Sequence, residues 1–338
     1  MSLLNKASIL LTPTAYDTSE LLSIKPDDGG GDFDFSRPSS AERINDSGGF
    51  ETMASNVPRI DYTGGTASFL LEPRTTNLYL NSATLTTQDC STPAVQHGSE
   101  YTVSFYGTGS ITFSGSYSGS LSGTGTNDRV SLTFTVSGSV LTSTVSGTVT
   151  NAQLESNPAA STYIPTTSST VTRREEQCKN AGDSSLISGT EGVLYAEFAI
   201  SNLFDQNTSQ KSTRSIGMSF NTGTSNALFM GINPNNKFYF FFRANGSNVI
   251  FNQTISANVG QYYKVAFKYK SGDTSVYIDG QEVLTSSNSF TISQTLGNLA
   301  FNFGTPTFDF LSRFQGNTRC VAVFKEALTD AELICLTS

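Results

Sequence analysis

Tryptophan is absent from this chain of 338 residues, and histidine occurs once, at position 97. Large carbohydrate platforms often use tryptophan, so its absence weighs slightly against a strong sugar-stacking site. A Ser-His-Asp triad would have to use His97, which lies in a Gln-His-Gly turn, and no G-x-S-x-G motif is present. We therefore interpret His97 as an exposed loop residue.

Charged residues make up only 14% of the chain, and the net charge is −8. The sequence contains no run of lysine and arginine, and Arg173-Arg174 is followed at once by Glu175-Glu176. The sequence therefore offers no basic patch that would bind the phosphates of a nucleic acid.

No apolar stretch is long enough to span a membrane. Residues 1–13 lack the pattern of a signal peptide, so we expect a chain made in a cytoplasm.

The four cysteines, Cys90, Cys178, Cys320 and Cys335, form no C-x-x-C pair. This spacing excludes zinc and thioredoxin-like motifs and predicts free, mostly buried thiols. Neither a Walker A motif nor a dinucleotide G-x-G-x-x-G motif occurs. The sequence therefore predicts no cofactor.

Glycine, serine, threonine and asparagine dominate what remains, which favours short strands joined by many turns. The clearest pattern covers residues 262–284, where apolar and polar side chains alternate in two strands. Each strand should have one buried and one solvated face. Asp279-Gly280 fits a type I′ turn, which needs a positive φ at both central residues. This stretch resembles laminin-G-like (concanavalin-like) jelly rolls, so we predict such a domain over residues 187–338.

A second resemblance carries more specific motifs. Residues 33–82 resemble a module of tail-fibre, head-fibre and related structural proteins of tailed bacteriophages. The departures are small, since Ser36 and Glu42 stand where that module has threonine. The matching runs are Phe35-Ser36-Arg37, Ala41-Glu42-Arg43-Ile44-Asn45, Asn56-Val57-Pro58-Arg59-Ile60-Asp61-Tyr62 and Leu70-Leu71-Glu72-Pro73-Arg74-Thr75-Thr76-Asn77-Leu78. The resemblance implies a structural role and assigns no catalytic residue.

The segment 83–165 alternates apolar residues between Gly/Ser clusters, which predicts a small β-sandwich. Its end, from Ala152-Gln153-Leu154-Glu155 to Val171-Thr172-Arg173, resembles the close of a carbohydrate-binding-module-like domain in the same phage proteins, although Asn157-Pro158 replaces a Gly-rich turn. We predict an all-β protein with an irregular N-terminal attachment module (1–82), this sandwich (83–165), a linker (166–186) and the jelly roll (187–338). A short helix is expected over residues 3–11, and a second one begins at a Thr329-x-x-Glu332 capping box.

Acidic residues give little support for catalysis. Glucanases with a concanavalin-like fold use an E-x-D-x-x-E strand, which is missing, and Glu197 stands alone on its strand. Asp32-x-Asp34 is the nearest alternation, but it belongs to the N-terminal module. Asp273 and Asp279, and the loop 27–32, could be calcium ligands, yet turn aspartates commonly bond the local backbone instead. We predict no enzyme activity, no catalytic residue and no metal site, and the sequence identifies no ligand-binding residue.

The aromatic run 237–243 places phenylalanines on one strand face and Tyr239 with Phe241 on the other. One face must fill the core, and a buried second sheet or a partner surface explains the other better than a sugar platform does.

The sequence thus favours a structural protein of a bacteriophage virion, such as a head or tail fibre or a capsid-decorating appendage. We expect a homo-oligomer, for instance a trimer, that contacts other virion proteins through the N-terminal module. The alternative is a virion adhesin whose jelly roll recognises host glycans. A third option, a depolymerase, would cleave a polysaccharide.

Overall fold

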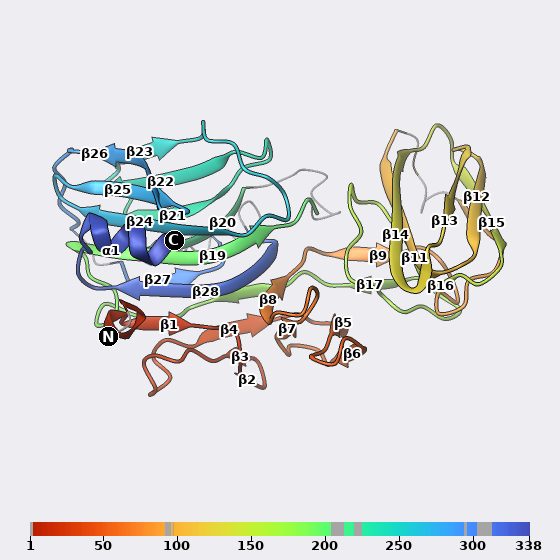
Figure 1. Ribbon diagram of the computed structural model, residues 1–338, viewed down its shortest axis with the longest axis horizontal. Coiled ribbons are helices and arrows are strands. Elements are labelled where there is room, and N and C mark those ends of the chain that lie inside the picture. The colour runs from red at the N-terminus through yellow and green to blue at the C-terminus, as the bar shows by residue number, and fades with distance from the viewer. Residues whose placement is uncertain are drawn as a thin grey trace.

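The computed structural model describes residues 3–91, 96, 98–203, 213–219, 225–293, 296–302 and 313–338. Two lobes lie side by side along the long axis, and both chain ends lie on the larger one (Figure 1). Strands account for nearly all regular structure, which confirms the predicted all-β class. The strands β9 (Thr75–Asn77) and β17 (Val171–Arg173) pair with each other and connect the lobes.

The larger lobe is a sandwich of two antiparallel sheets. The five-stranded sheet has the order β23 (Ser247–Asn252), β22 (Phe238–Ala244), β21 (Ala227–Ile232), β20 (Arg214–Ser219), β27 (Asn298–Ala300). The eight-stranded sheet has the order β26 (Gln281–Ser286), β25 (Thr274–Ile278), β24 (Tyr263–Lys270), β19 (Glu191–Ile200), β28 (Gly316–Phe324), β8 (Ser68–Leu71), β7 (Arg59–Asp61), with β1 (Ile9–Leu11) also pairing with β28. This arrangement is the predicted jelly roll.

The core lies between these two sheets and is rich in phenylalanine. The rings of Phe240 and Phe242 meet Phe267 of the facing sheet edge-on, with centroids 6.0 Å and 6.4 Å apart. Such edge-to-face contacts are the favoured geometry of aromatic pairs. The period-two pattern of the sequence separated the two faces of β22 and β24, and the structure shows which face of each strand fills the core.

The opposite face of β24 is buried over part of its length, contrary to the sequence-based expectation, whereas Lys270 at its end is exposed. Ala266 is fully buried and Lys268 is 3% exposed. The helix α1 (Asp330–Thr337) packs on this face, and the 3₁₀ helix η1 (Leu3–Lys6) packs against the same cluster of buried side chains. Lys268 keeps its charge paired, since its Nζ lies 2.8 Å from Asp273 and 3.0 Å from Asp330.

The N-terminal segment contributes strands to the larger lobe. The helix predicted over residues 3–11 is wrong, because η1 ends at Lys6 and residues 9–11 form strand β1. Ile9 and Leu11 are fully buried in the core of the larger lobe. Together with β7 and β8, β1 ties the N-terminal segment to the jelly roll through backbone hydrogen bonds, so these three strands are part of the larger lobe's sheet.

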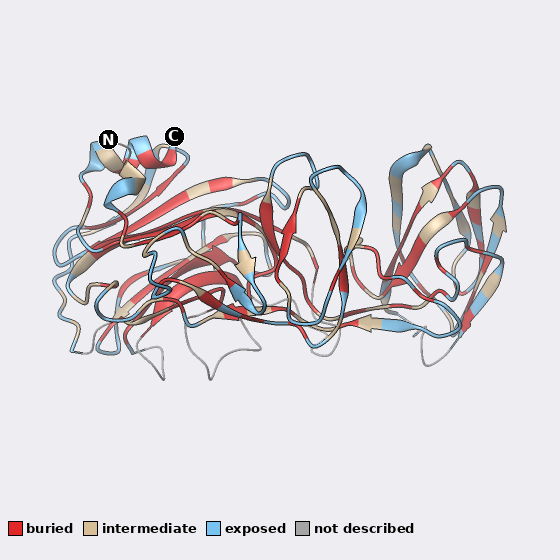
Figure 2. Cartoon of the chain, turned by 90° about the horizontal axis from the view of Figure 1, so that it is seen from below, coloured by how far each residue is buried: buried red, intermediate tan, exposed pale blue. Residues whose placement is uncertain are grey.

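The smaller lobe is the predicted sandwich. Its sheets have the orders β10 (Gln88–Ser91), β15 (Val140–Ser146), β12 (Ser110–Gly115), β13 (Gly119–Ser122) and β14 (Gly125–Thr135), β11 (Glu100–Gly107), β16 (Thr150–Glu155). Each lobe has its own buried interior, while the loops at the ends are exposed (Figure 2).

The remaining strands lie beneath and between the lobes. They form the sheet β18 (Gln177–Lys179), β4 (Phe33–Ser36), β3 (Glu20–Leu21), β2 (Tyr16–Asp17) and the hairpin β5 (Ala41–Ile44), β6 (Phe50–Met53). The predicted linker 166–186 contains β17 and β18, both paired with N-terminal strands. These two strands of the segment are therefore hydrogen-bonded to the N-terminal part of the chain.

Two local predictions are confirmed. Asp279 and Gly280 have φ values of 47° and 80°, as a type I′ turn requires. Thr329 and Glu332 form the capping box of α1.

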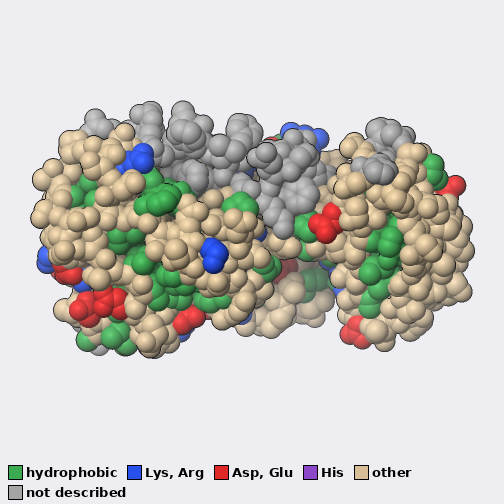
Figure 3. Space-filling model, turned by 90° about the horizontal axis from the view of Figure 1, so that it is seen from above, with side chains coloured by type: hydrophobic (Ala, Val, Ile, Leu, Met, Phe, Trp, Pro, Cys, Tyr) green, Lys and Arg blue, Asp and Glu red, His purple; other side chains and the backbone are tan. Residues whose placement is uncertain are grey.

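All four cysteines are free thiols, and Cys335 alone among them is exposed. Few charged side chains interrupt the surface in the view from above, where a hollow separates the lobes (Figure 3). Within the described residues, no helix has the length and hydrophobicity that crossing a bilayer requires.

Candidate functional site: a buried ionic junction between the lobes

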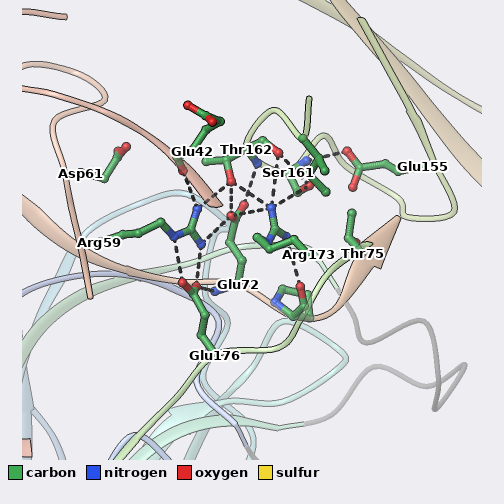
Figure 4. Close-up of polar contacts among 12 residues, drawn as sticks. Glu42, Arg59, Asp61, Glu72, Thr75, Glu155, Ser161, Thr162, Arg173 and Glu176 are labelled. Carbon is green, nitrogen blue, oxygen red and sulfur yellow. Dashed lines mark hydrogen bonds and ion pairs between the residues drawn. The ribbon is translucent and has the colours of Figure 1, made fainter. Parts of the chain in front are cut away.

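Three arginines and two glutamates meet between the lobes, at residues that the sequence analysis noted only as parts of motifs. Arg37 follows β4, Arg59 lies in β7, and Glu72 follows β8. Arg173 ends β17, and Glu176 immediately precedes β18. Figure 4 shows these side chains, apart from Arg37, converging with Thr162 from the closing segment of the smaller lobe. We call these six residues the junction.

Arg59 is the centre of the junction. Its Nε and Nη2 donate to the two carboxylate oxygens of Glu176, at 2.8 Å and 2.5 Å. Nη2 also lies 2.8 Å from Glu72 Oε2, and Nη1 donates to Thr162 Oγ1 at 2.7 Å. Such a forked, charge-assisted pairing is among the stronger polar contacts in proteins. One guanidinium thus connects three segments of the chain.

Glu176 is held by two further donors. Its Oε1 accepts from Arg37 Nη1 at 2.7 Å, and its Oε2 accepts from the backbone N–H of Glu72 at 2.7 Å. Both carboxylate oxygens are therefore saturated, and Glu176 is 2% exposed. A carboxylate in this state cannot act as a nucleophile or as a general acid on an external substrate.

Thr162 links the smaller lobe to the junction. Its backbone N–H donates to Glu72 Oε1 at 2.8 Å, and its hydroxyl donates to Glu72 Oε2. Arg173 Nη1 lies 3.0 Å from Glu72 Oε2 and 2.9 Å from Thr162 Oγ1. Glu72 therefore binds the smaller lobe and the connecting strand at once.

The charges of the junction are mutually stabilised. Burial opposes ionisation of Glu72, but the Arg173 and Arg59 guanidiniums outweigh it and lower the pKa of Glu72 to about 2. Burial likewise opposes ionisation of Glu176, and Arg59 outweighs it, so this pKa is also lowered. Three arginines face two glutamates, which leaves one excess positive charge (3 − 2 = 1). Burial lowers the pKa of Arg37 and of Arg173. At Arg59 the attraction of the two glutamates outweighs burial, so the pKa of Arg59 is raised.

The junction is a structural device. Arg37 and Arg59 are fully buried and Arg173 is 1% exposed, so no substrate reaches them. Removing one partner of a buried ion pair costs about 3–5 kcal/mol, because the other charge is left uncompensated. The arrangement holds the two lobes in one relative orientation.

The acidic candidates from the sequence do not assemble into a catalytic group. Glu197 faces Arg319, with 3.4 Å between Oε1 and Nη1. Asp34 accepts from Asn180 Nδ2 at 2.7 Å, and Asp32 accepts from the backbone N–H of Ser23 at 2.7 Å. In the described ranges, no three residues of the types Asp, Glu, His and Cys gather as metal ligands would. His97 lies outside the described residues.

The calcium alternatives are bonded locally. Asp279 Oδ1 accepts from the backbone N–H of Lys264 at 2.9 Å, and Asp273 pairs with Lys268. In the loop 27–32, Asp28 Oδ1 accepts from the backbone N–H of Gly30 at 3.0 Å. These contacts agree with the interpretation of the aspartates as turn residues.

The two faces of β22 have the environments that the sequence analysis distinguished. Phe238, Phe240 and Phe242 lie in the core, while Phe241 stacks on Phe229 on the other side, with centroids 4.6 Å apart. Phe241 is 5% exposed, whereas Phe251 at the edge of this second cluster is 53% exposed. The second aromatic face is thus largely covered.

Sequence reasoning missed the junction because its members are up to 139 residues apart. One signal was present: Arg59 and Glu72 stand next to apolar runs, in Pro58-Arg59-Ile60 and Phe69-Leu70-Leu71-Glu72. A charged residue in such a position is buried only when it is paired. This signal predicts that partners exist, but not which ones.

Comparison with known proteins finds a family match within the larger lobe. Residues 182–334 match the family model described as the concanavalin A-like lectin/glucanases superfamily. This part of the chain is therefore a concanavalin A-like, laminin-G-like domain, as the sequence predicted. The match says nothing about a bacteriophage origin, which stays a prediction. No curated protein matches the chain.

Similar solved structures include a sialidase of Trypanosoma rangeli, with 15% identity and a TM-score of 0.36, covering 47% of this chain and 25% of the sialidase. A heptameric SAP-like pentraxin from Limulus polyphemus has 16% identity and a TM-score of 0.37, covering 47% of this chain and 74% of the pentraxin. The CBM40 of a Ruminococcus gnavus IT-sialidase, bound to α2,3-sialyllactose, has 12% identity and a TM-score of 0.36, covering 47% of this chain and 94% of that one. The chain thus spans about a quarter of the sialidase.

Proposed function

We propose that this protein acts by binding a glycan through its concanavalin A-like lobe, without breaking a bond. The match of residues 182–334 to a family of lectins and glucanases carries this proposal. The lectin alternative is favoured over the glucanase one because Glu197 is occupied by Arg319 and the glutamates of the junction are buried and saturated. A glycosidase needs two carboxyl groups that reach the sugar from opposite sides.

A glycan array with the purified full chain tests this proposal, and a reducing-end assay on the bound polysaccharides tests the enzymatic alternative. We expect retention of at least one glycan and no release of reducing ends. Release of reducing ends would establish a depolymerase. Failure to bind any sugar at millimolar concentration would remove the glycan proposal.

We further propose that the protein is a structural subunit of a bacteriophage virion, made in the bacterial cytoplasm and incorporated as a head-fibre, tail-fibre or capsid-decorating appendage. Support comes from the phage-like motifs, which contribute Arg37, Arg59, Glu72 and Arg173 to the junction. An appendage that presents a binding lobe in a fixed direction needs such a rigid connection. Antibody labelling of intact particles tests the location, and a protein found free in lysate but absent from particles would contradict it.

The chain is proposed to work as a homo-oligomer, such as a trimer, that contacts other virion proteins through its N-terminal segment. Several linked copies would multiply weak contacts with host glycans. Light scattering coupled to gel filtration measures the number of copies directly. A strictly monomeric chain at micromolar concentration would contradict this part of the proposal.

A further inference from the structure

A crevice of about 330 Å³ lies where the two lobes meet. The larger lobe contributes the end of β19 and the loop before β24, including Ser201, Val259 and Tyr262. The smaller lobe contributes Ala159 and Ala160, just after β16. Its size lies near the lower end of the range of about 300–1,000 Å³ that is typical of small-molecule sites. The crevice therefore fits a ligand the size of a sugar unit.

The lining of the crevice is uncharged but rich in hydrogen-bonding groups. Among the residues that the structure describes, no Asp, Glu, Lys, Arg or His side chain lines it, although the chain as a whole carries a net charge of −8. Thr63, Ser201 and Asn317 supply hydroxyl and amide groups next to the small apolar residues. The Ser201 hydroxyl is buried and has no hydrogen-bond partner within the described part of the chain.

The ring of Tyr262 is held in place by an ion pair behind it. The Arg319 guanidinium lies 3.6 Å from the ring centroid, and Arg319 in turn faces Glu197 at 3.4 Å. Because Arg319 covers one face of the ring, Tyr262 meets the crevice with its other face or its edge. A fixed aromatic ring beside amide and hydroxyl groups suits the mixed apolar and hydroxylated surface of a sugar.

The junction also shapes this crevice. Ala160 is two residues before Thr162, whose backbone and side chain are both bonded to Glu72. The wall that the smaller lobe supplies is therefore fixed relative to the larger lobe before any ligand arrives. Pre-organisation of this kind lowers the entropy that binding costs.

We propose that the crevice between the lobes is a binding site for an uncharged sugar unit, and that both lobes are needed to form it. This inference rests on the proposed glycan-binding function and assigns its location and ligand class. A carboxylated sugar is disfavoured, because no cation of the described residues lines the crevice to compensate its charge, and Arg319 behind Tyr262 already faces Glu197.

The first test compares neutral and anionic sugars on the full chain. The probes are lactose, maltose and chitobiose, with α2,3-sialyllactose as the anionic counterpart of lactose, measured by saturation-transfer NMR. We expect saturation transfer to a neutral sugar and a weaker signal for sialyllactose than for lactose. Stronger binding of sialyllactose than of every neutral sugar would overturn the ligand class.

The second test locates the site with variants, using the strongest binder from the glycan array. Ala160→Phe fills the crevice from the smaller lobe and should abolish binding, while Tyr262→Ala should weaken it by about tenfold. Phe251→Ala is the matched control, because it removes an exposed aromatic ring from another surface. Circular dichroism checks that each variant is folded. If Tyr262→Ala is unfolded, the result for Ala160→Phe decides whether the crevice is the site.

The outcomes separate the two proposals. If the wild type binds a glycan and both crevice variants bind it equally well, the crevice is not the site and the proposed function stands. Loss of binding in Phe251→Ala alone would place the site on the outer aromatic cluster and overturn this inference. If the wild type binds no glycan on the array, both proposals fall.

Discussion

The junction and the outer face of the larger sheet both contain ion pairs, yet their surroundings differ greatly. Arg59 and Glu176 have fully buried side chains, whereas Lys6 and Glu332, on the outer face, have side chains that are 57% and 26% exposed. In water, an ion pair contributes about 0–1 kcal/mol, because solvent competes for both charges. In a buried site, the pair gains more from attraction but must first lose its hydration.

This difference shows that, in a chain with few charged residues, the buried charges serve to connect the two lobes. Among the described residues, the buried apolar clusters of the two lobes are separate, and the junction links the lobes through multiple charge-assisted bonds. Such bonds are directional, so they fix an orientation that apolar contacts alone leave looser. The pairs on the outer face, by comparison, only add to packing that α1 and β1 already provide.

Replacing Arg59 with methionine should have the largest effect. The substitution leaves Glu72 and Glu176 without their shared partner, so we expect a loss of about 3–5 kcal/mol in unfolding free energy. Urea denaturation followed by circular dichroism measures it. Lys270→Met is the control, since Lys270 makes an exposed pair with Glu191 and should cost less than about 1 kcal/mol. Equal effects of the two substitutions would remove the distinction between the regions.

Acidification should weaken the junction next. Glu72 has a pKa of about 2 in the folded protein, below its ordinary value of 4.5, and the pKa of Glu176 is lowered in the same direction. A group with a lowered folded pKa contributes stability that is complete above the unfolded pKa and is lost as pH falls through the folded one. We therefore expect stability to decline from about pH 4.5 towards pH 2.

Denaturation series at several pH values check this decline, and Glu72→Gln supplies the comparison. The variant is less stable at neutral pH, and its stability should depend less on pH in the same window. An unchanged pH dependence in Glu72→Gln would show that Glu72 does not contribute as inferred.

Removing the cap of α1 should have a moderate effect. Thr329→Ala deletes the oxygen that accepts from the Glu332 backbone N–H at 3.3 Å. Loss of such an N-cap typically costs about 1 kcal/mol. A thermal melt measures the change, with Ser287→Ala in an exposed loop as the control. A loss as large as that of Arg59→Met would mean that the outer face matters as much as the junction.

The smallest effect on stability is expected for Lys6→Met. A hydrogen bond from Lys6 is the main cause that lowers the pKa of Glu332 to about 2. The variant should raise that pKa towards its ordinary value while changing stability by less than about 1 kcal/mol. NMR titration of the Glu332 carboxyl carbon reports the pKa, and an unshifted value would contradict the assigned pairing.

Local signals in the sequence predicted much of the fold. Alternation in β22 and β24, the positive-φ turn at Asp279-Gly280 and the capping box at Thr329 each depend on a few neighbouring residues. The error at residues 3–11 has a different origin. Ile9 and Leu11 form a strand because β28, more than 300 residues later, offers them a partner, and local propensity does not reveal that partner.

The junction was beyond local reasoning for the same reason. Arg173-Arg174 next to Glu175-Glu176 reads as neighbouring charges that cancel, but Arg173 pairs with Glu72 and Glu176 pairs with Arg37 and Arg59. The crevice was equally hidden, because Ala160 and Tyr262 come from different lobes. The division into 1–82, 83–165, 166–186 and 187–338 stays a prediction, although β1, β7 and β8 join its first part to the sheet of its last.

The central claim is that the junction holds the lobes in one orientation, and the distance between them tests it most directly. Double electron–electron resonance measures that distance between two spin labels. One label is attached to the exposed Cys335 of the larger lobe, and the other to Ser120→Cys in the smaller lobe. We predict one narrow distribution in the wild-type background that broadens in Arg59→Met. A broad distribution in the wild-type background, unchanged by Arg59→Met, would contradict the claim.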